Sequence, residues 1–179
     1  MNSGITVGDK EFSISDIQKP VDEILEARKS VDTSQMQLAS GADLIRNQAQ
    51  FAIISVLLDQ IASDMKIDFT SADIATRRTE IVAQVVGEQG LPAALVSSNL
   101  ATSNLEPYIK VRLIIDKLTS NFIEVGASPE QASEGVSRLI VAAAKKLGVE
   151  INPKYGTWNP ITASIESGDI TDGAVTPAP

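Results

Sequence analysis

Near its end, the chain leaves a helical pattern and runs VEINPKYGTWNP over residues 149–160. Asn-Pro pairs bound the central part of this run, which carries two large aromatic side chains, Tyr155 and Trp158. A short run of this kind between turn residues is typical of a strand. Because the two rings have too much apolar surface to remain in solvent, we expect residues 155–158 to form a strand that packs on another part of the chain.

The opening of the chain supplies the expected surface. Residues 5–14 read ITVGDKEFSI, which is two short β-prone runs joined by Gly8 and Asp9. This pair tolerates the positive φ angles of a tight hairpin turn. An isolated hairpin is only marginally stable in water, and residues 149–158 are the clearest other β-prone segment. We therefore predict that the two ends of the chain meet, with residues 155–158 paired to the hairpin.

Composition indicates how the rest of the core is built. The chain has 179 residues, enough for one domain that buries roughly two thirds of its unfolded surface. Hydrophobic residues make up 43% of the chain and aromatic residues only 4%, so the core must consist mainly of Leu, Ile, Val and Ala. These residues recur at helical spacing, which favours an α-rich fold.

Apolar stripes with the period of a helix follow one another between the two ends. They predict helices over about residues 15–28, 42–65, 70–86, 91–98, 103–122 and 128–147. The helix over 42–65 is apolar around more than one face, so we expect it to be central and the most buried. Residues 31–40 have no such period and are predicted to form a loop.

Serine-led capping boxes mark three of the predicted helix starts. They are Ser15–Gln18, Ser103–Glu106 and Ser128–Gln131. Pro20 lies too deep for the first turn of the first helix, so this helix either kinks there or starts near Lys19.

Together these patterns predict a mainly α fold, a bundle of about six helices closed by a small β-hairpin and short strands from the N- and C-terminal segments. We predict a single domain over residues 1–163. Residues 164–179 hold acids, prolines and small residues with little apolar content, which is typical of a disordered tail.

The charge balance argues against some classes of partner. The chain has 23 acidic against 15 basic residues and a net charge of -8, whereas nucleic-acid binding needs clustered Lys and Arg. Pairs such as Arg77-Arg78 are isolated and are typical of a solvated helix surface. The apolar stretch over 51–58 is too short to cross a bilayer. We therefore expect no nucleic-acid partner and no direct insertion into a membrane.

The residue types that carry most catalytic and metal chemistry are missing. The chain has no His and no Cys, which removes the commonest general base, thiol nucleophiles and the usual zinc ligands. Acidic pairs such as Asp64 with Asp68 are far more typical of solvated surface than of a catalytic dyad. Residues 87–90, GEQG, lack the lysine and the preceding strand of a phosphate loop. We predict no catalytic residue, no metal site and no cofactor.

The two ends and the order of elements resemble the SurA N-terminal chaperone domain, the non-catalytic part of extracytoplasmic SurA-like foldases. In that family a valine-asparagine-glycine hairpin leads into a helix that starts Ser-Asp, and residues 7–9 and 15–16 look similar, with Gly-Asp at the turn. Residues 152–156, Asn-Pro-Lys-Tyr-Gly, look like the family's Asn-Pro-Arg-aromatic-Gly ending. The likeness is closest to short, often lipid-anchored members of Gram-positive actinobacteria.

This resemblance implies an ATP-independent holdase chaperone that binds unfolded or nascent secreted polypeptides in an apolar groove. It also implies a location outside the cytoplasmic membrane, in the cell envelope or at the cell surface, where a lipidated cysteine upstream of this sequence can tether the module. Larger relatives add a parvulin-type prolyl isomerase domain that uses a pair of histidines. The chain has no histidine, so isomerase activity is not implied. The alternative is a cell-surface structural or assembly protein that docks one dedicated partner through the same groove.

Aromatic and thioether side chains are the candidates for contact with a polypeptide client, because rings supply sequence-tolerant contact area and methionines adapt to varied partners. The candidates are Met36, Met65, Tyr108, Phe122, Tyr155 and Trp158. Ordinary core packing is the alternative for each of them. For Trp158 it is the better interpretation, with the C-terminal strand packed on the hairpin.

Overall fold

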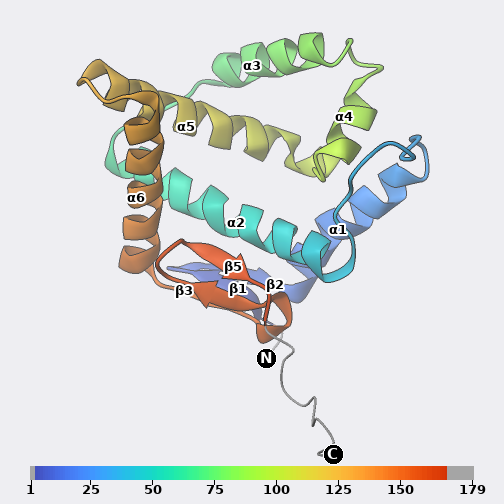
Figure 1. Cartoon of the computed structure of the whole chain (residues 1–179), viewed down its shortest axis with the longest axis horizontal. Helices are drawn as coiled ribbons and strands as arrows, with labels where there is room; N and C mark the ends of the chain where they lie inside the picture. Colours follow the sequence, from blue (N-terminus) through green and yellow to red (C-terminus); the bar gives the residue numbers. More distant parts are fainter. Residues whose placement is uncertain (1–2, 169–179) are drawn as a thin grey trace, which may run out of the picture.

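The computed structural model describes residues 3–168 and is mainly helical (Figure 1). The described residues form the α-helices α1 (Ile14–Arg28), α2 (Gly41–Asp64), α3 (Ser71–Gln84), α4 (Leu91–Ser97), α5 (Leu105–Glu124) and α6 (Pro129–Leu147). They also form the strands β1 (Ser3–Val7), β2 (Lys10–Ser13), β3 (Val149–Ile151), β4 (Thr157–Asn159) and β5 (Ser164–Glu166), and the 3₁₀ turns η1 (Thr102–Asn104) and η2 (Pro153–Tyr155). The predicted mainly α fold, with a small sheet made from both ends of the chain, is confirmed.

β1 is the middle strand of an antiparallel sheet with the order β2-β1-β3. On one side it forms the predicted hairpin with β2, in which Val7 lies opposite Lys10. Gly8, the first turn residue, has a φ of 59°, as in a type II′ turn. On the other side β1 pairs with β3, and Ile5 lies opposite Ile151. The predicted meeting of the two chain ends is therefore confirmed.

The predicted strand over residues 155–158 is wrong in its extent and in its partner. Tyr155 ends the turn η2, which the side chain of Asn152 caps. Pro153 has no N–H with which to continue the ladder from β3. Gly156, with a φ of 126°, then redirects the chain, so that β4 pairs with β5 and not with the hairpin.

The predicted tail starts too early, because Ser164–Glu166 forms β5. The side-chain amide of Gln50 in α2 donates to the carbonyl of Ala163 at 2.9 Å and accepts from the N–H of Ile165 at 2.7 Å. Gln50 thus satisfies this backbone as a neighbouring strand would, and Ile165 is buried. The domain therefore extends beyond its predicted end. Residues 169–179 of the predicted tail lie outside the described residues.

α2 is the central helix, as predicted (Figure 1). It packs on α1, α5, α6 and β1. Its buried side chains are Leu44, Gln48, Ala49, Ile53, Leu57, Leu58, Ile61 and Ala62. Each fully buried Leu or Ile contributes about 1.5–3 kcal/mol, so the packing around α2 is the main source of stability in the domain.

The first helix starts earlier than predicted. Its cap is Ser13 instead of Ser15, and the Ser13 hydroxyl accepts from the N–H of Asp16 at 3.1 Å. Because Ser13 also ends β2, the helix begins directly where the hairpin ends. Pro20 therefore lies inside α1, and the predicted start near Lys19 is wrong.

The other two predicted capping boxes have opposite outcomes. The box at Ser128–Gln131 is confirmed as the start of α6. The box at Ser103–Glu106 is wrong, because α5 starts at Leu105 without a side-chain cap. The Ser103 hydroxyl instead donates to the carboxylate of Glu23 in α1 at 2.8 Å. The Ser103 hydroxyl therefore makes a tertiary contact and does not form the helix cap that the local sequence pattern predicts.

A polar cluster centred on Asn99 holds α1, α2 and the loop between them to the segment after α4. The Asn99 side-chain oxygen accepts from Arg28 Nη2 at 2.8 Å and from the N–H of Ala39 at 3.2 Å. The Asn99 carbonyl accepts from Gln48 Nε2 at 3.0 Å, and only 4% of Gln48 is exposed. Asn99 has a φ of 51°, a left-handed conformation that Asn tolerates better than most residues.

Asn99→Ala is expected to lower the free energy of unfolding by roughly 2–4 kcal/mol, since it leaves the Arg28 and Ala39 donors without their acceptor. Asn99→Asp is the matched control, because a carboxylate keeps both acceptor contacts and tolerates the same φ. We expect the control to lie within about 1 kcal/mol of the wild type. Chemical denaturation measures both variants. Equal losses would contradict the role of these hydrogen bonds.

Gly156→Ala tests the turn into β4. A Cβ at this position would lie 2.0 Å from the carbonyl oxygen of Glu166, so the variant must displace the β4–β5 backbone. Gly148→Ala is the control, because Gly148 also has a positive φ, 79°, but no atom within 4 Å of an added Cβ. We expect a loss of about 1–3 kcal/mol for the control from backbone strain. The loss for Gly156→Ala should be larger by about 2 kcal/mol in thermal or chemical unfolding, and similar losses would refute the close approach.

Candidate functional site

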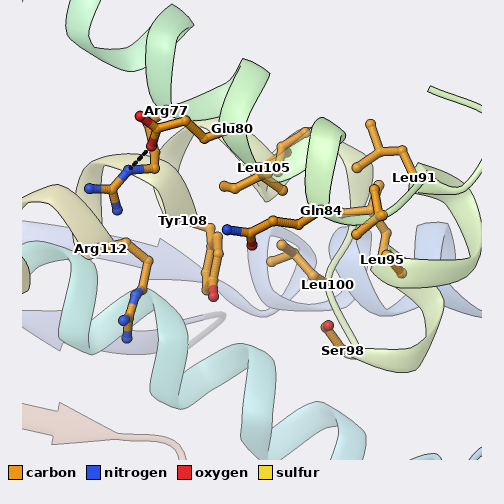
Figure 2. Close-up of a pocket in the computed structure, with 13 residues that line it drawn as sticks. Arg77, Glu80, Gln84, Leu91, Leu95, Ser98, Leu100, Leu105, Tyr108 and Arg112 are labelled. Carbon is orange, nitrogen blue, oxygen red and sulfur yellow. Dashed lines mark ion pairs between the residues drawn. The ribbon is translucent and has the colours of Figure 1, made fainter. Parts of the chain in front are cut away.

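The candidate site is a groove of about 540 Å³ bordered by α3, α4 and α5, which we call the α3–α5 groove (Figure 2). Its apolar lining consists of Ile81, Val85, Leu91, Ala94, Leu95, Leu100 and Leu105. Its polar and charged lining consists of Arg77, Glu80, Gln84, Ser98, Tyr108 and Arg112. An apolar wall combined with a small set of polar groups is typical of a ligand site.

α3 forms one wall of the groove. It starts at a capping box, in which Thr70 accepts from the N–H of Asp73 at 3.2 Å and the Asp73 carboxylate accepts from the N–H of Thr70 at 2.7 Å. In Figure 1, α3 lies along α5 on the side away from the β-sheet, and α5 is the element on which it chiefly packs. Among the α-helices described, α3 alone has no buried residue. Its apolar side chains are only partly covered by the leucines of α4 and α5.

The antiparallel course of α3 and α5 gives the groove two chemically different ends. One face of α3 passes from Arg77 through Ile81 to Val85, the residue directly after the helix. One face of α5 passes from Leu105 through Tyr108 to Arg112. Because the helices run in opposite directions (Figure 1), their charged ends lie together and their apolar ends lie together. Figure 2 shows Tyr108 and Arg112 projecting from α5 in the same direction, one helical turn apart.

At the charged end, two arginines share one carboxylate. Arg77 Nη1 lies 2.7 Å from Asp116 Oδ2, and Arg77 Nε lies 3.1 Å from Glu80. The hydrogen bond to Asp116 is the main reason that the pKa of Arg77 is raised above its usual value. Arg112 lies 3.7 Å from the other oxygen of Asp116, which is beyond hydrogen-bonding distance, and 47% of its side chain is exposed. Arg77 is therefore held by two close ion pairs, whereas Arg112 has none this close.

At the apolar end, the groove is closed by the tight connection from α3 to α4. A Cβ on Gly90 would lie 1.6 Å from the carbonyl oxygen of Val85, so this turn requires glycine. Arg78 contacts both carboxylate oxygens of Glu88, at 2.6 and 3.1 Å, and its hydrogen bond lowers the pKa of Glu88. The connection thereby brings both Val85 and Leu91 into the lining.

Tyr108 is the one predicted contact residue that lines the groove. Tyr155 is 2% exposed and belongs to the main core. Its hydroxyl has no hydrogen-bond partner among the described residues, and burial raises its pKa. The ring of Phe122 packs against Gly135 of α6, and Trp158 of β4 is partly buried against the same core. Core packing, the alternative given for each aromatic, fits these three.

The two predicted methionines lie on other parts of the surface. Met36 is in the loop between α1 and α2 and is partly exposed. Met65 is the residue after α2 and is 45% exposed. Neither lines the α3–α5 groove. The structure therefore does not gather the predicted contact residues into one site.

The arginines and leucines of the groove are candidates that sequence reasoning missed. The pattern predicts Arg77 as solvated charge, yet only 26% of its side chain is exposed and it pairs with α5. Leu91 and Leu95 fit an ordinary helical core face equally well. The sequence does contain one signal for the groove. Residues 71–84 carry too few apolar side chains for more than one side of this helix to be covered by other parts of the protein.

Neither a metal centre nor a membrane-spanning helix is found in the described part of the chain. Within residues 3–168, no group of three or more His, Cys, Asp or Glu side chains is placed to hold a metal ion. Across the same residues, no helix combines the length and the apolar character needed to cross a membrane.

Comparisons with known protein families, with curated proteins and with solved structures find no match. The resemblance to the SurA N-terminal domain therefore stays a prediction.

Arg77→Met is expected to loosen α3 from α5 without unfolding the domain. The variant keeps an aliphatic stem but loses the ion pair with Asp116, which at this partial exposure contributes about 1 kcal/mol. Amide hydrogen exchange over residues 71–84 should therefore accelerate by about fivefold.

Arg78→Met is the matched control for this experiment. Arg78 pairs with Glu88 in the connection after α3 and not with α5, so its loss should leave exchange in α3 close to the wild-type rate. Hydrogen exchange read by mass spectrometry compares the two variants. Equal acceleration in both would show that Arg77 is not a specific tie to α5.

Proposed function

We propose that this protein is an ATP-independent, holdase-type chaperone that binds apolar segments of unfolded or nascent polypeptides in the α3–α5 groove. The observation that carries the proposal is the apolar end of the groove, where leucine side chains of α4 and α5 form a wall beside polar groups. A surface of this composition suits the apolar side chains of another molecule. The proposal assigns no catalytic step to the chain.

The size of the groove suits a short segment of a client. Its volume of about 540 Å³ lies within the range of about 300–1,000 Å³ that is usual for ligand pockets. Burial of one apolar client side chain contributes about 1.5–3 kcal/mol, while association itself costs at least about 4 kcal/mol. A few buried side chains therefore give weak binding, and a client can dissociate without ATP hydrolysis.

Charge and resemblance support the same proposal. The net charge of -8 keeps a binder of apolar segments soluble. The likeness of residues 5–16 and 151–158 to the SurA N-terminal domain adds secreted polypeptides as the clients. It also adds a location outside the cytoplasmic membrane to the proposal.

Suppression of aggregation is the direct test. An unrelated protein is diluted from denaturant with and without this protein, and light scattering follows its aggregation. We expect suppression at several-fold molar excess in the absence of nucleotide, because transient binding of exposed apolar segments slows their association. Undiminished scattering at that excess would contradict the proposal.

Ser98→Trp tests whether the groove is responsible. Ser98 is exposed and lines the groove, so an indole at this position occupies space that a client side chain would fill. We expect suppression to fall by roughly threefold or more. Ser97→Trp is the matched control, since Ser97 is the exposed neighbour outside the lining. If both variants behave alike, the binding site lies elsewhere.

Affinity capture distinguishes the chaperone from an assembly protein. A holdase is expected to retain many unrelated polypeptides in their unfolded state and to release them when they fold. A protein that docks one dedicated partner is expected to retain a single folded partner to saturation. The second outcome would replace the chaperone proposal with the assembly alternative.

A further inference from the structure

We infer that the α3–α5 groove prefers apolar segments that carry an acidic side chain close to their apolar residues. The inference rests on the proposed function and names its substrate class. Apolar side chains of the client fill the end lined by Leu91, Leu95 and Leu105. The client carboxylate binds the guanidinium of Arg112 at the other end.

Arg112 is a cationic group in the groove with unused hydrogen-bonding capacity. A guanidinium has five N–H donors in a planar fork that matches a carboxylate. Its nearest ion-pair partner, Asp116 Oδ1, lies 3.7 Å away, and Arg112 makes no hydrogen bond to another side chain or backbone group within residues 3–168. The other oxygen of Asp116 is held by Arg77 at 2.7 Å. A client carboxylate can therefore bind Arg112 without displacing an existing hydrogen bond.

The acidic groups near Arg112 leave it available. Glu80 and Asp116 are both paired with Arg77, at 3.1 and 2.7 Å. The charged lining consists of Arg77, Arg112 and Glu80, and Asp116 faces both arginines, so this end of the groove holds two cations and two anions. The remaining acids of this acidic chain act through solvent, where physiological salt screens charges beyond about 8 Å. The feature that favours a client carboxylate at this end is therefore the unfilled guanidinium of Arg112, and not a net positive charge.

The dimensions of the groove match one short peptide segment. Arg112 follows Leu105 by two turns of α5, which is about 10 Å along the helix axis. An extended chain covers this length with about three residues. In the view of Figure 2, Gln84 and Tyr108 lie between the arginines and the leucines, where their polar groups can bond to the client backbone. The acidic side chain is thus expected within about four residues of the apolar ones.

Fluorescence anisotropy with a labelled peptide series tests the inference. The probe is a leucine-rich peptide with one glutamate, acetylated and amidated so that it has no terminal charge. Two further peptides carry Gln or Lys in place of the glutamate. We expect the Glu peptide to bind about fivefold more tightly than the Gln peptide and the Lys peptide to bind most weakly. The difference should shrink as salt is raised.

Variants of this chain locate the preference. Arg112→Gln should abolish the difference between the Glu and Gln peptides, and Arg112→Glu should reverse the order in favour of the Lys peptide. Arg138→Gln is the matched control, because Arg138 is an exposed arginine of α6 outside the groove and its loss changes the net charge equally. Circular dichroism and thermal unfolding confirm that each variant is folded. A preference that survives Arg112→Gln overturns the inference.

The outcomes separate this inference from the proposed function. If the Glu and Gln peptides bind equally well, the acidic preference is wrong while the apolar groove remains the binding site. If none of the peptides binds, the proposed function fails and the inference fails with it. A free C-terminal acid on the Gln peptide is the last arm. If the Gln peptide with a free C-terminal carboxylate binds more tightly and the Glu peptide does not, the groove binds the C-terminus of a chain. That result overturns the assignment to an acidic side chain.

Discussion

The burial of β1 is the constraint on which the rest of the structure depends. Ile5 and Val7 of this strand are at most 1% exposed and lie in the core around α2. β2 and β3 pair with β1 on its two sides. The Gly8 N–H donates to the Gly148 carbonyl at 3.1 Å, so the end of α6 is fixed to the hairpin turn. These contacts join opposite ends of the chain. Because the entropy cost of closing a loop grows only slowly with its length, apolar burial at β1 can offset it.

Stability decreases from this closure toward the helices that border the groove. α2 is buried along its length and contacts both the sheet and the other long helices, whereas α3 has no buried residue and depends on partial apolar cover and the Arg77–Asp116 pair. Segments with few buried contacts open at lower free energy than the core. Under the proposed function, such freedom would let α3 adjust to varied apolar chains while the tightly packed β1–α2 region keeps the fold intact.

The sequence predicts most of the architecture because its main signals are local. Helical periodicity identifies α2 and α6, and the need to cover a hairpin identifies the meeting of the ends. Failures occur where tertiary contacts decide. Gln50 pairs with the backbone of β5, and Ser103 bonds Glu23 instead of capping α5. In the groove, Tyr108 is the lining residue that the sequence analysis named as a candidate. The candidate role of Arg112 could not be predicted from the sequence, because it depends on the antiparallel packing of α3 and α5, which places Arg77 against Asp116.

The family resemblance and the functional argument rest on different residues. The motifs that resemble the SurA N-terminal domain lie at the end of β1, in the hairpin turn, at the start of α1 and around η2, where Tyr155 is core and the turn at Gly156 leaves no room for a side chain. These residues close the fold and do not line the groove. The groove is built by α3, α4 and α5, which the resemblance matches only in order and approximate length. Motifs that close a fold carry information about architecture, whereas binding depends on side chains that related folds can vary. The binding proposal therefore depends on the groove chemistry, and a change at Arg112 or Ser98 can alter it while the fold stays the same.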